Sequence, residues 1–260
     1  MKSKTNIQQV ALFFALFAMP YFAFSQSKSM ADTAKVDKIK QTTQFSGVAT
    51  VTNNGISLVP TFSLGKPAAI FNFAAKGERL SFEPELDFAI EGAKPWGFMF
   101  WVRYKLIQSD KFKLNIGTHP AFVFSDIATS TNGISKNLLT ADRYWAAEIS
   151  PSYLLSKDLS VGLYYLYGRG LNEGITLNSH FLGINGALSN IKLSDQFSFR
   201  LIPMLFYLKL DGNEGTYLTS TFTLTKNNCP FSISSVVTKS IKTNIQGDSF
   251  VWNVSLAYAY

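Results

Sequence analysis

The clearest structural signal in the chain lies in residues 79–91, which read RLSFEPELDFAIE. Every even-numbered residue from Leu80 to Ile90 is apolar, and the odd-numbered residues are polar or charged apart from Ala89. Successive side chains of a β-strand point to opposite faces, so this alternation predicts a strand with one wholly apolar face. In a helix the same residues would scatter both sets around the circumference.

The same alternation recurs in residues 96–107, 111–125 and 250–260. These segments are 11 to 15 residues long, whereas strands of soluble sheets usually have about 5–6 residues. A strand that crosses a bilayer at a tilt needs about 9–11 residues. Small, charged and amide side chains form one continuous face, and large aromatic side chains form the other. The pattern therefore predicts a membrane barrel with its apolar face outside.

The connections between the expected strands alternate in length along most of the chain. The long ones are expected at 127–140, 169–174, 211–215 and 241–248, with short turns between them. Outer-membrane barrels have short periplasmic turns and longer extracellular loops. The sequence thus predicts an all-β fold, a transmembrane antiparallel up-and-down β-barrel with its C-terminus on the periplasmic side.

The number of strands is expected to be twelve, with fourteen as the alternative. Twelve candidate strands follow from residue 56 onward, and residues 45–52 form a further one. The residues Asn53-Asn54-Gly55 after it are a good hairpin signal. The count stays at twelve if residues 45–52 lie outside the barrel wall. It also stays at twelve if residues 65–67 are a bend within one long strand and not a turn between two strands.

The N-terminal region has the features of an export signal. Lys2 and Lys4 precede an apolar run over residues 10–24, and Ala23 and Ser25 supply the small residues of a cleavage site. We expect residues 1–25 to be a signal peptide, 26–44 a polar periplasmic arm and 45–260 the barrel.

Composition excludes several classes of protein. Charged residues make up only 16% and aromatic residues 15% of the chain, which excludes general disorder. The single cysteine, Cys229, excludes an internal disulfide and a multi-cysteine metal site. We therefore expect no metal and no cofactor. The excess of positive charge is too diffuse to indicate nucleic-acid binding.

The last strand carries a resemblance to a known group. Residues 250–260, FVWNVSLAYAY, alternate and end on an aromatic residue. In this the chain resembles Gram-negative outer-membrane β-barrel proteins, whose assembly machinery reads such a C-terminal signal. The resemblance implies a location in the outer membrane, with outer-membrane lipid and the assembly machinery as partners. It implies no catalytic residue, because the group shares none.

The inward face carries the residues with functional potential. If residues 79–91 and 97–107 pair through a turn at 92–95, Glu83 and Glu85 fall near Arg103 and Lys105. Opposite charges at facing positions stabilise a sheet. These charges either neutralise one another in a filled lumen or line a channel. The lumen-lining charged candidates are Glu83, Glu85, Asp87, Glu91, Arg103, Lys105, Lys111, Lys113, Glu148 and Arg200.

Aromatic residues near strand ends are expected to anchor the barrel at the two membrane interfaces. The candidates are Trp96, Trp145, Trp252, Tyr258 and Tyr260, with Tyr144 beside them.

The function expected from these observations is a porin-like channel that passes small polar solutes through a charged lumen. The main alternative is a closed barrel with a structural, adhesive or partner-binding role carried by its external loops. A more remote alternative is a lipid hydrolase with Ser and His on the outer wall. His119 lies on the inward parity, however, and the face of His180 beside Ser179 is left open, as is a pairing of His180 with Ser189. We therefore expect no enzyme activity.

Overall fold

The computed structural model describes residues 43–131 and 134–260. Two short 3-10 helices, η2 (Pro60–Phe62) and η3 (Glu91–Ala93), lie in connections between strands. Among the residues described, no helix is long and apolar enough to cross a membrane. The strands are β1 (Gln44–Thr52), β2 (Ala68–Lys76), β3 (Leu80–Ala89), β4 (Pro95–Gln108), β5 (Phe112–Thr131), β6 (Ile134–Ser156), β7 (Leu159–Gly170), β8 (Asn178–Lys192), β9 (Phe197–Leu210), β10 (Asn213–Lys226), β11 (Phe231–Thr243), β12 (Phe250–Trp252) and β13 (Ser255–Ala259).

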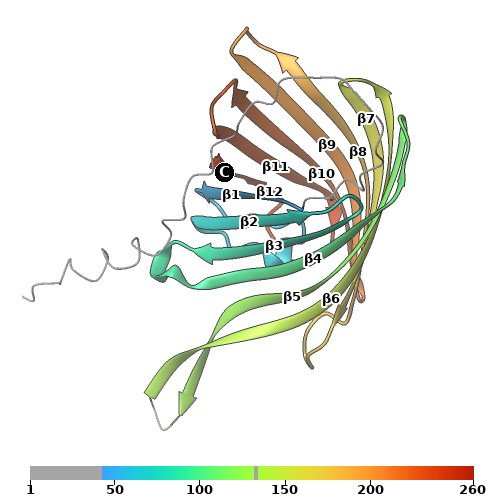
Figure 1. Cartoon of the computed structure of the whole chain (residues 1–260). Coiled ribbons are helices and arrows are strands. Elements are labelled where there is room, and N and C mark those ends of the chain that lie inside the picture. The colour runs from blue at the N-terminus through green and yellow to red at the C-terminus, as the bar shows by residue number, and fades with distance from the viewer. Residues whose placement is uncertain (1–42, 132–133) are drawn as a thin grey trace, which may run out of the picture. The chain divides into compact units, whose positions relative to one another are not determined.

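The strands form one antiparallel sheet that closes on itself. From β1 to β11 each strand pairs with its neighbours in the sequence. β11 then pairs with β12 and β13, and β13 pairs with β1, where Ser255 lies opposite Thr52. Because β12 and β13 share one position in the wall, the barrel has twelve strands. Figure 1 shows the sheet curving around a central interior. The predicted up-and-down barrel of twelve strands is confirmed.

The last wall strand is interrupted between β12 and β13, and side chains satisfy the backbone at the break. The side-chain oxygen of Asn253 accepts a hydrogen bond from the Val236 N–H at 2.8 Å. The hydroxyl of Ser235 donates to the Asn253 carbonyl at 2.6 Å. On the other side, the Val254 N–H donates to the side chain of Asn53 at 2.7 Å. The interruption therefore leaves these groups paired, as a membrane environment requires.

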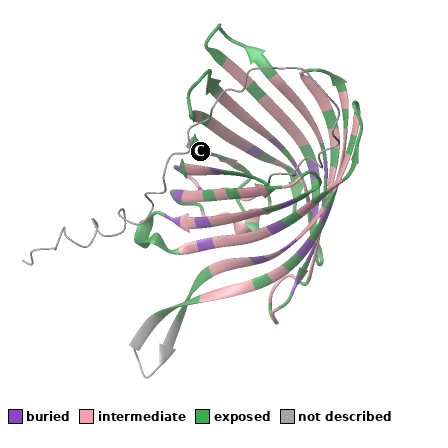
Figure 2. Ribbon diagram, in the orientation of Figure 1, coloured by how far each residue is buried: buried purple, intermediate pink, exposed green. Residues whose placement is uncertain are grey.

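Alternate residues along the strands face opposite sides of the wall. Large exposed apolar side chains, such as Leu80 and Phe82 on β3, occupy the outward positions. The inward positions of the same strand carry Ser81 and Asp87, which are buried. In Figure 2, exposed and half-buried residues cover most of the wall, and buried residues form only short patches. This distribution agrees with an apolar outer surface and an interior that is polar over much of its area.

The predicted arrangement at the start of the barrel is wrong in one respect. Residues 45–52 belong to β1, which lies in the wall between β2 and β13. Residues 56–64, which were expected to form a strand, instead belong to the connection between β1 and β2 and include η2. Neither a strand outside the wall nor a bend at 65–67 within one long strand is present. The number of strands is right because one candidate replaces the other.

Two of the expected long connections are also shorter than predicted. Residues 127–140 do not form an open loop, because β5 and β6 continue as a paired hairpin up to Thr131 and Ile134. Residues 211–215 contain a tight turn, since Leu210 already pairs with Asn213. The remaining long connections lie at the same end of the barrel as these two.

The expected signal peptide, 1–25, lies outside the described residues, as does the arm at 26–44 except for its end. The last residue assigned to that arm, Gln44, is the first residue of β1 and pairs with Lys76.

Candidate functional site

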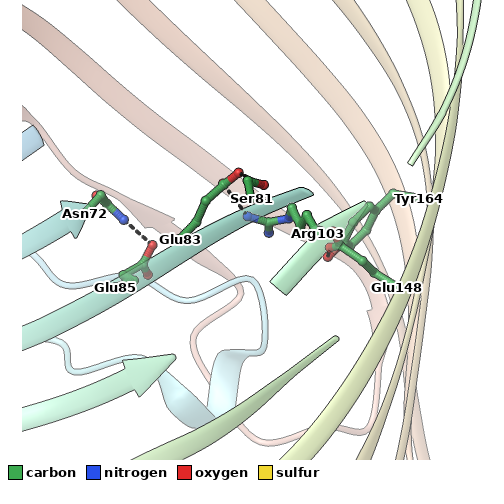
Figure 3. Close-up of polar contacts among 7 residues, drawn as sticks. All are labelled: Asn72, Ser81, Glu83, Glu85, Arg103, Glu148 and Tyr164. Carbon is green, nitrogen blue, oxygen red and sulfur yellow. Dashed lines mark hydrogen bonds and ion pairs between the residues drawn. The ribbon is translucent and has the colours of Figure 1, made fainter. Parts of the chain in front are cut away.

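The inner wall carries a network of charged side chains centred on Arg103 of β4. Its Nη1 donates to Glu83 of β3 at 2.8 Å, and its Nε donates to Glu148 of β6 at 2.7 Å. The hydroxyl of Tyr164 on β7 donates to the second oxygen of Glu148 at 2.6 Å. Figure 3 shows these side chains from β3, β4, β6 and β7 pointing toward one another. One guanidinium therefore links the walls formed by β3, β4 and β6.

Arg103 and Glu148 meet across β5 because the intervening residue is Gly117. Gly117 pairs with Arg103 on one side and with Glu148 on the other. A Cβ atom at this position would lie 2.8 Å from Glu148 Oε1 and 3.0 Å from Arg103 Cγ. The absence of a side chain on β5 is thus what allows an ion pair between strands that are not neighbours.

The other carboxylates of β3 have different partners. The Ser81 hydroxyl donates to Glu83 at 2.7 Å, and the Asn72 amide of β2 donates to Glu85. Figure 3 shows the contact of Asn72 with Glu85 beside the Arg103 network. Asp87 lies further along the same face, and its Oδ1 has no hydrogen-bond partner. The three acids therefore form a row on one strand, of which only the first pairs with a cation.

Aromatic side chains continue around the interior from Tyr164. Its ring makes an edge contact with Phe181 of β8, which stacks on Phe206 of β9 with ring centroids 4.6 Å apart. Phe206 stacks on Tyr217 of β10 at 5.0 Å. With Leu208, Leu210 and Ile245, these rings form an apolar cluster inside the barrel. The interior thus has a charged wall on β3 to β6 and an apolar wall on β8 to β10.

The connection between β1 and β2, residues 53–67, crosses the interior and covers the apolar wall. Val59 packs against the cluster of Phe181 and Phe206. Phe62 contacts the ring of Tyr144 on β6, with centroids 5.2 Å apart. The Trp96 indole N–H donates to the Phe62 carbonyl at 2.8 Å. We call residues 53–67 the inner loop.

The charged wall retains access to solvent. The side chains of Arg103 and Glu83 are 30% and 24% exposed, whereas that of Glu148 is 3% exposed. A cavity of about 220 Å³ lies against this wall, with Asn72, Glu83, Glu85, Trp101 and Arg103 among its lining residues. Since Glu83 and Arg103 lie on the inner face of a closed barrel, the space that exposes them is the lumen.

The predicted lumen residues fall into two groups. Arg103, Glu83 and Glu148 come together as an ion-paired network, and Glu85 and Asp87 lie beside it. The remaining candidates lie away from this network. Lys105 donates to the Glu78 carbonyl at 3.1 Å, instead of pairing with the acids of β3. Lys113 and Arg200 occupy exposed inward positions near the beginnings of β5 and β9.

Two predicted lumen residues do not line the lumen wall. Glu91 is in η3, between β3 and β4, where it pairs with Lys66 at 3.6 Å with both side chains largely exposed. Lys111 lies in the turn between β4 and β5, one residue before β5 begins. β3 ends earlier and β5 begins later than the alternation predicts.

The predicted membrane anchors also fall into two groups, those on the outer surface and those that face the interior. Trp145, Trp252, Tyr258 and Tyr260 are exposed on the outward parity of their strands. Trp96 is only 8% exposed, and its indole N–H binds the inner loop. Its assignment as a lipid-facing anchor is wrong because a register shift next to Phe88 moves the start of β4 out of the expected alternation. Tyr144, the further interfacial candidate, faces inward against Phe62.

The two histidines lie on opposite faces of the wall. His119 is buried on the inward face, and its ring contacts that of Trp101 at a tilt of 47°, with ring centroids 3.7 Å apart. His180 lies on the outward parity, beside exposed Leu182, and its Nδ1 hydrogen-bonds the Tyr165 hydroxyl at 2.9 Å. Ser179 therefore points to the opposite face from His180. Within the described part of the chain, no serine hydroxyl forms a hydrogen bond with either histidine.

Several residues of the site could not be identified from the sequence. Phe181, Phe206 and Tyr217 are aromatic residues on the inward face, where the pattern of a membrane barrel predicts polar ones. The one signal in the sequence is that the adjacent apolar residues Phe181 and Leu182 cannot both lie on the outward face of a strand. Among the described residues, no group of three or more potential metal ligands is gathered at one place.

Comparison with known proteins bears on the fold. No family model matches the sequence, and neither does any curated protein. The solved KdgM porin is 12% identical, with a TM-score of 0.50 over 83% of this chain and 99% of that chain. The KdgM porin in complex with disordered oligogalacturonate gives 11% identity and the same TM-score over the same shares. The NanC porin gives 13% identity and a TM-score of 0.47, over 83% of this chain and 98% of that chain.

The chain has the fold of outer-membrane β-barrel proteins. At these identities the comparison with KdgM establishes the architecture, and the properties of the lumen follow from the residues of this chain.

Proposed function

We propose that this protein is a porin-like channel of the outer membrane that passes small polar solutes. The observation that carries the proposal is the partial exposure of Arg103 and Glu83 on the inner face of a closed barrel. A lumen filled by side chains would desolvate this ion pair, and burial of charges is costly even when they are paired. An aqueous path along the charged wall avoids that cost.

The inner loop supports a limit on the size of the solute. It occupies part of the interior and packs Val59 against the apolar cluster on β8 to β10. The open path is therefore expected to follow β2 to β6, between the inner loop and the charged wall. Barrels of this size lie between those filled by side chains and those with wide aqueous channels. Passage would therefore be restricted to small solutes.

The proposed location rests on the same features. The wall is apolar outside and closed, so that each strand from β1 to β11 has a paired strand on both sides, as a bilayer requires. The KdgM barrel, which shares the architecture, is a porin. Export by removal of residues 1–25, insertion into a Gram-negative outer membrane and recognition of the C-terminal strand by the assembly machinery belong to the proposal.

Liposome swelling tests this function. The purified, folded protein is incorporated into liposomes, which are then diluted into isotonic solutions of neutral sugars of increasing size. We expect rapid swelling with small sugars and none with large ones. Liposomes containing heat-denatured protein serve as the control. Swelling no faster than in this control, for every sugar, would contradict the proposal.

A closed barrel with a binding role is the second candidate, and one observation favours it. The apolar cluster is almost completely buried, with Val59 of the inner loop packed against it, so part of the interior is packed like a protein core. In that case the hairpin of β5 and β6 and the other loops at that end would carry the function. The absence of swelling in a folded sample would support this alternative.

A further inference from the structure

The acidic row of β3 is the least neutralised group of charges on the described inner wall. Glu83, Glu85 and Asp87 share the inward face of this strand. Glu83 and Glu148 both pair with the single guanidinium of Arg103, so these three side chains together keep one negative charge. Glu85 and Asp87 have no ion pair with any described cation.

Asp87 is the most unusual member of the row. It is 4% exposed, and its Oδ1 has no hydrogen-bond partner. Its neighbours across the sheet are Ile70 and Gly97, whose side chains offer no donor. A buried carboxylate oxygen without a partner is costly, and such groups are normally paired with a cation or a donor. The wall therefore lacks the group that Asp87 requires.

From these contacts we infer that Glu85 and Asp87 form a binding site for a small monovalent cation, an alkali ion or a primary ammonium group, and that this site makes the channel cation-selective. The inference rests on the proposed channel function and names the class of solute. Asn72 contributes to the site by holding Glu85 through its amide. Two carboxylates suit an oxygen-preferring cation of low charge.

Arg103 and Lys76 line the same cavity as Glu85, whereas Asp87 lies further along β3, and the other basic residues of the inner wall lie toward the opposite end of this strand. Lys76 is the last residue of β2, at the end where Gln44 begins β1. Lys113 and Arg200 lie near the beginnings of β5 and β9, at the same end. Glu85 and Asp87 lie toward the opposite end of β3, the end connected through η3. Lys113 and Arg200 are thus separated from Asp87 along the path, and Asp87 lies opposite Gly97, the residue after Trp96, whose indole binds the inner loop.

This arrangement predicts a preference against polyanions. A carboxylated sugar would be repelled at Glu85 and Asp87, although the shared architecture includes a porin solved with oligogalacturonate. A solute with an ammonium group would instead find two carboxylates without a cation.

The test is the reversal potential of the purified protein in a planar bilayer with a potassium chloride gradient. We expect potassium to permeate better than chloride. Asp87→Asn and Glu85→Gln each remove one charge without changing the size of the side chain. In water, a negative charge about 8 Å from the path raises the local concentration of potassium about twofold and lowers that of chloride about twofold. Removing one such charge should therefore lower the potassium-to-chloride permeability ratio about fourfold.

Glu91→Gln is the matched control, because Glu91 loses the same charge in the exposed η3 connection. Its permeability ratio should stay close to that of the unchanged protein. A heat-dependent gel shift establishes that each variant is folded before it is measured.

The outcomes separate this inference from the function on which it rests. Conductance without cation preference would overturn the inference and leave the channel intact. The same holds for a ratio that neither Asp87→Asn nor Glu85→Gln changes, which would mean that the pair holds a proton. Folded protein that never conducts would overturn the channel itself.

Discussion

Gly117 controls whether Arg103 can reach Glu148. Replacing Gly117 by Val would place atoms where the Glu148 carboxylate and the Arg103 side chain now lie. We expect the free energy of unfolding to fall by about 1–3 kcal/mol from overpacking, with a further loss if the buried carboxylate is left unpaired. Urea unfolding in lipid vesicles measures the change.

Gly186→Val is the matched control for this prediction. A Cβ atom at Gly186 would have its nearest described neighbour at 3.8 Å, an ordinary contact. Gly186 lies on the outward parity of β8, so an apolar side chain there should be tolerated. Equal destabilisation by both substitutions would show that the Arg103–Glu148 pair does not depend on Gly117.

Asp211 links two connections at one end of the barrel. Its carboxylate accepts the backbone N–H groups of Leu177 and Asn178, each at 2.8 Å. These two hydrogen bonds lower the pKa of the Asp211 carboxyl below its usual value. A lowered folded-state pKa stabilises the fold above the unfolded value of about 3.9. That contribution is lost as the pH falls through the lower, folded-state pKa.

The prediction is that Asp211→Ala speeds hydrogen exchange at the amides of Leu177 and Asn178 at neutral pH. The unchanged protein should gain the same local mobility only at acidic pH, below the usual aspartate pKa. Exchange rates at these amides that are equal in both proteins at neutral pH would contradict this role.

At the scale of the element, the inner loop is the part of the structure that alternation does not identify. Ile56, Leu58, Pro60, Phe62 and Leu64 alternate with less apolar residues, as in a strand. A segment that crosses a barrel interior can also present every second side chain to a packed surface, so period two does not distinguish the two cases. Conversely, β1 has small residues on both faces, so its sequence shows little difference in polarity between them.

The inner loop should be removable without loss of the barrel. Its ends are already joined, because the Gly55 N–H donates to the Lys66 carbonyl at 2.8 Å. Replacing residues 56–64 by a short glycine-serine linker should therefore preserve the wall and widen the path. We expect a larger single-channel conductance and an unchanged heat-dependent gel shift. A folded variant with unchanged conductance would show that the loop does not narrow the path.

At the scale of the whole molecule, the lipid-facing and lumen-facing sides make different demands on charge. Leu86 lies on the outward face of β3 and Glu85 on the inward face. Leu86→Arg should cost about 2–4 kcal/mol near the middle of the membrane, whereas Glu85→Arg avoids this cost because it lies in the lumen. Unfolding in vesicles compares the two variants. Equal losses of stability would mean that the two faces have been assigned wrongly.

The architecture could be predicted from the sequence because the strands of a closed membrane barrel share one pattern, in which side chains alternate between the lipid and the lumen. Long period-two segments such as 79–91 and 250–260 place apolar residues outside along the wall. The count of twelve is right because residues 45–52 take the place in the wall that was expected for 56–64. The contacts between side chains inside the lumen follow no such pattern. The Arg103–Glu83 pair could be anticipated from facing positions, but its second bond, to Glu148, depends on a glycine on the strand between them. The aromatic stack on β8 to β10 is covered by the inner loop, which alternation had assigned to the wall.

Single-channel conductance of the purified, folded protein in a planar bilayer tests the central claim most directly. The account predicts stable conductance steps, because water-exposed Arg103 and Glu83 on the inner face of a closed barrel require an open path. A heat-dependent gel shift of the same sample confirms that the barrel is folded. A folded sample that never conducts would contradict the account and leave a barrel closed by its inner loop.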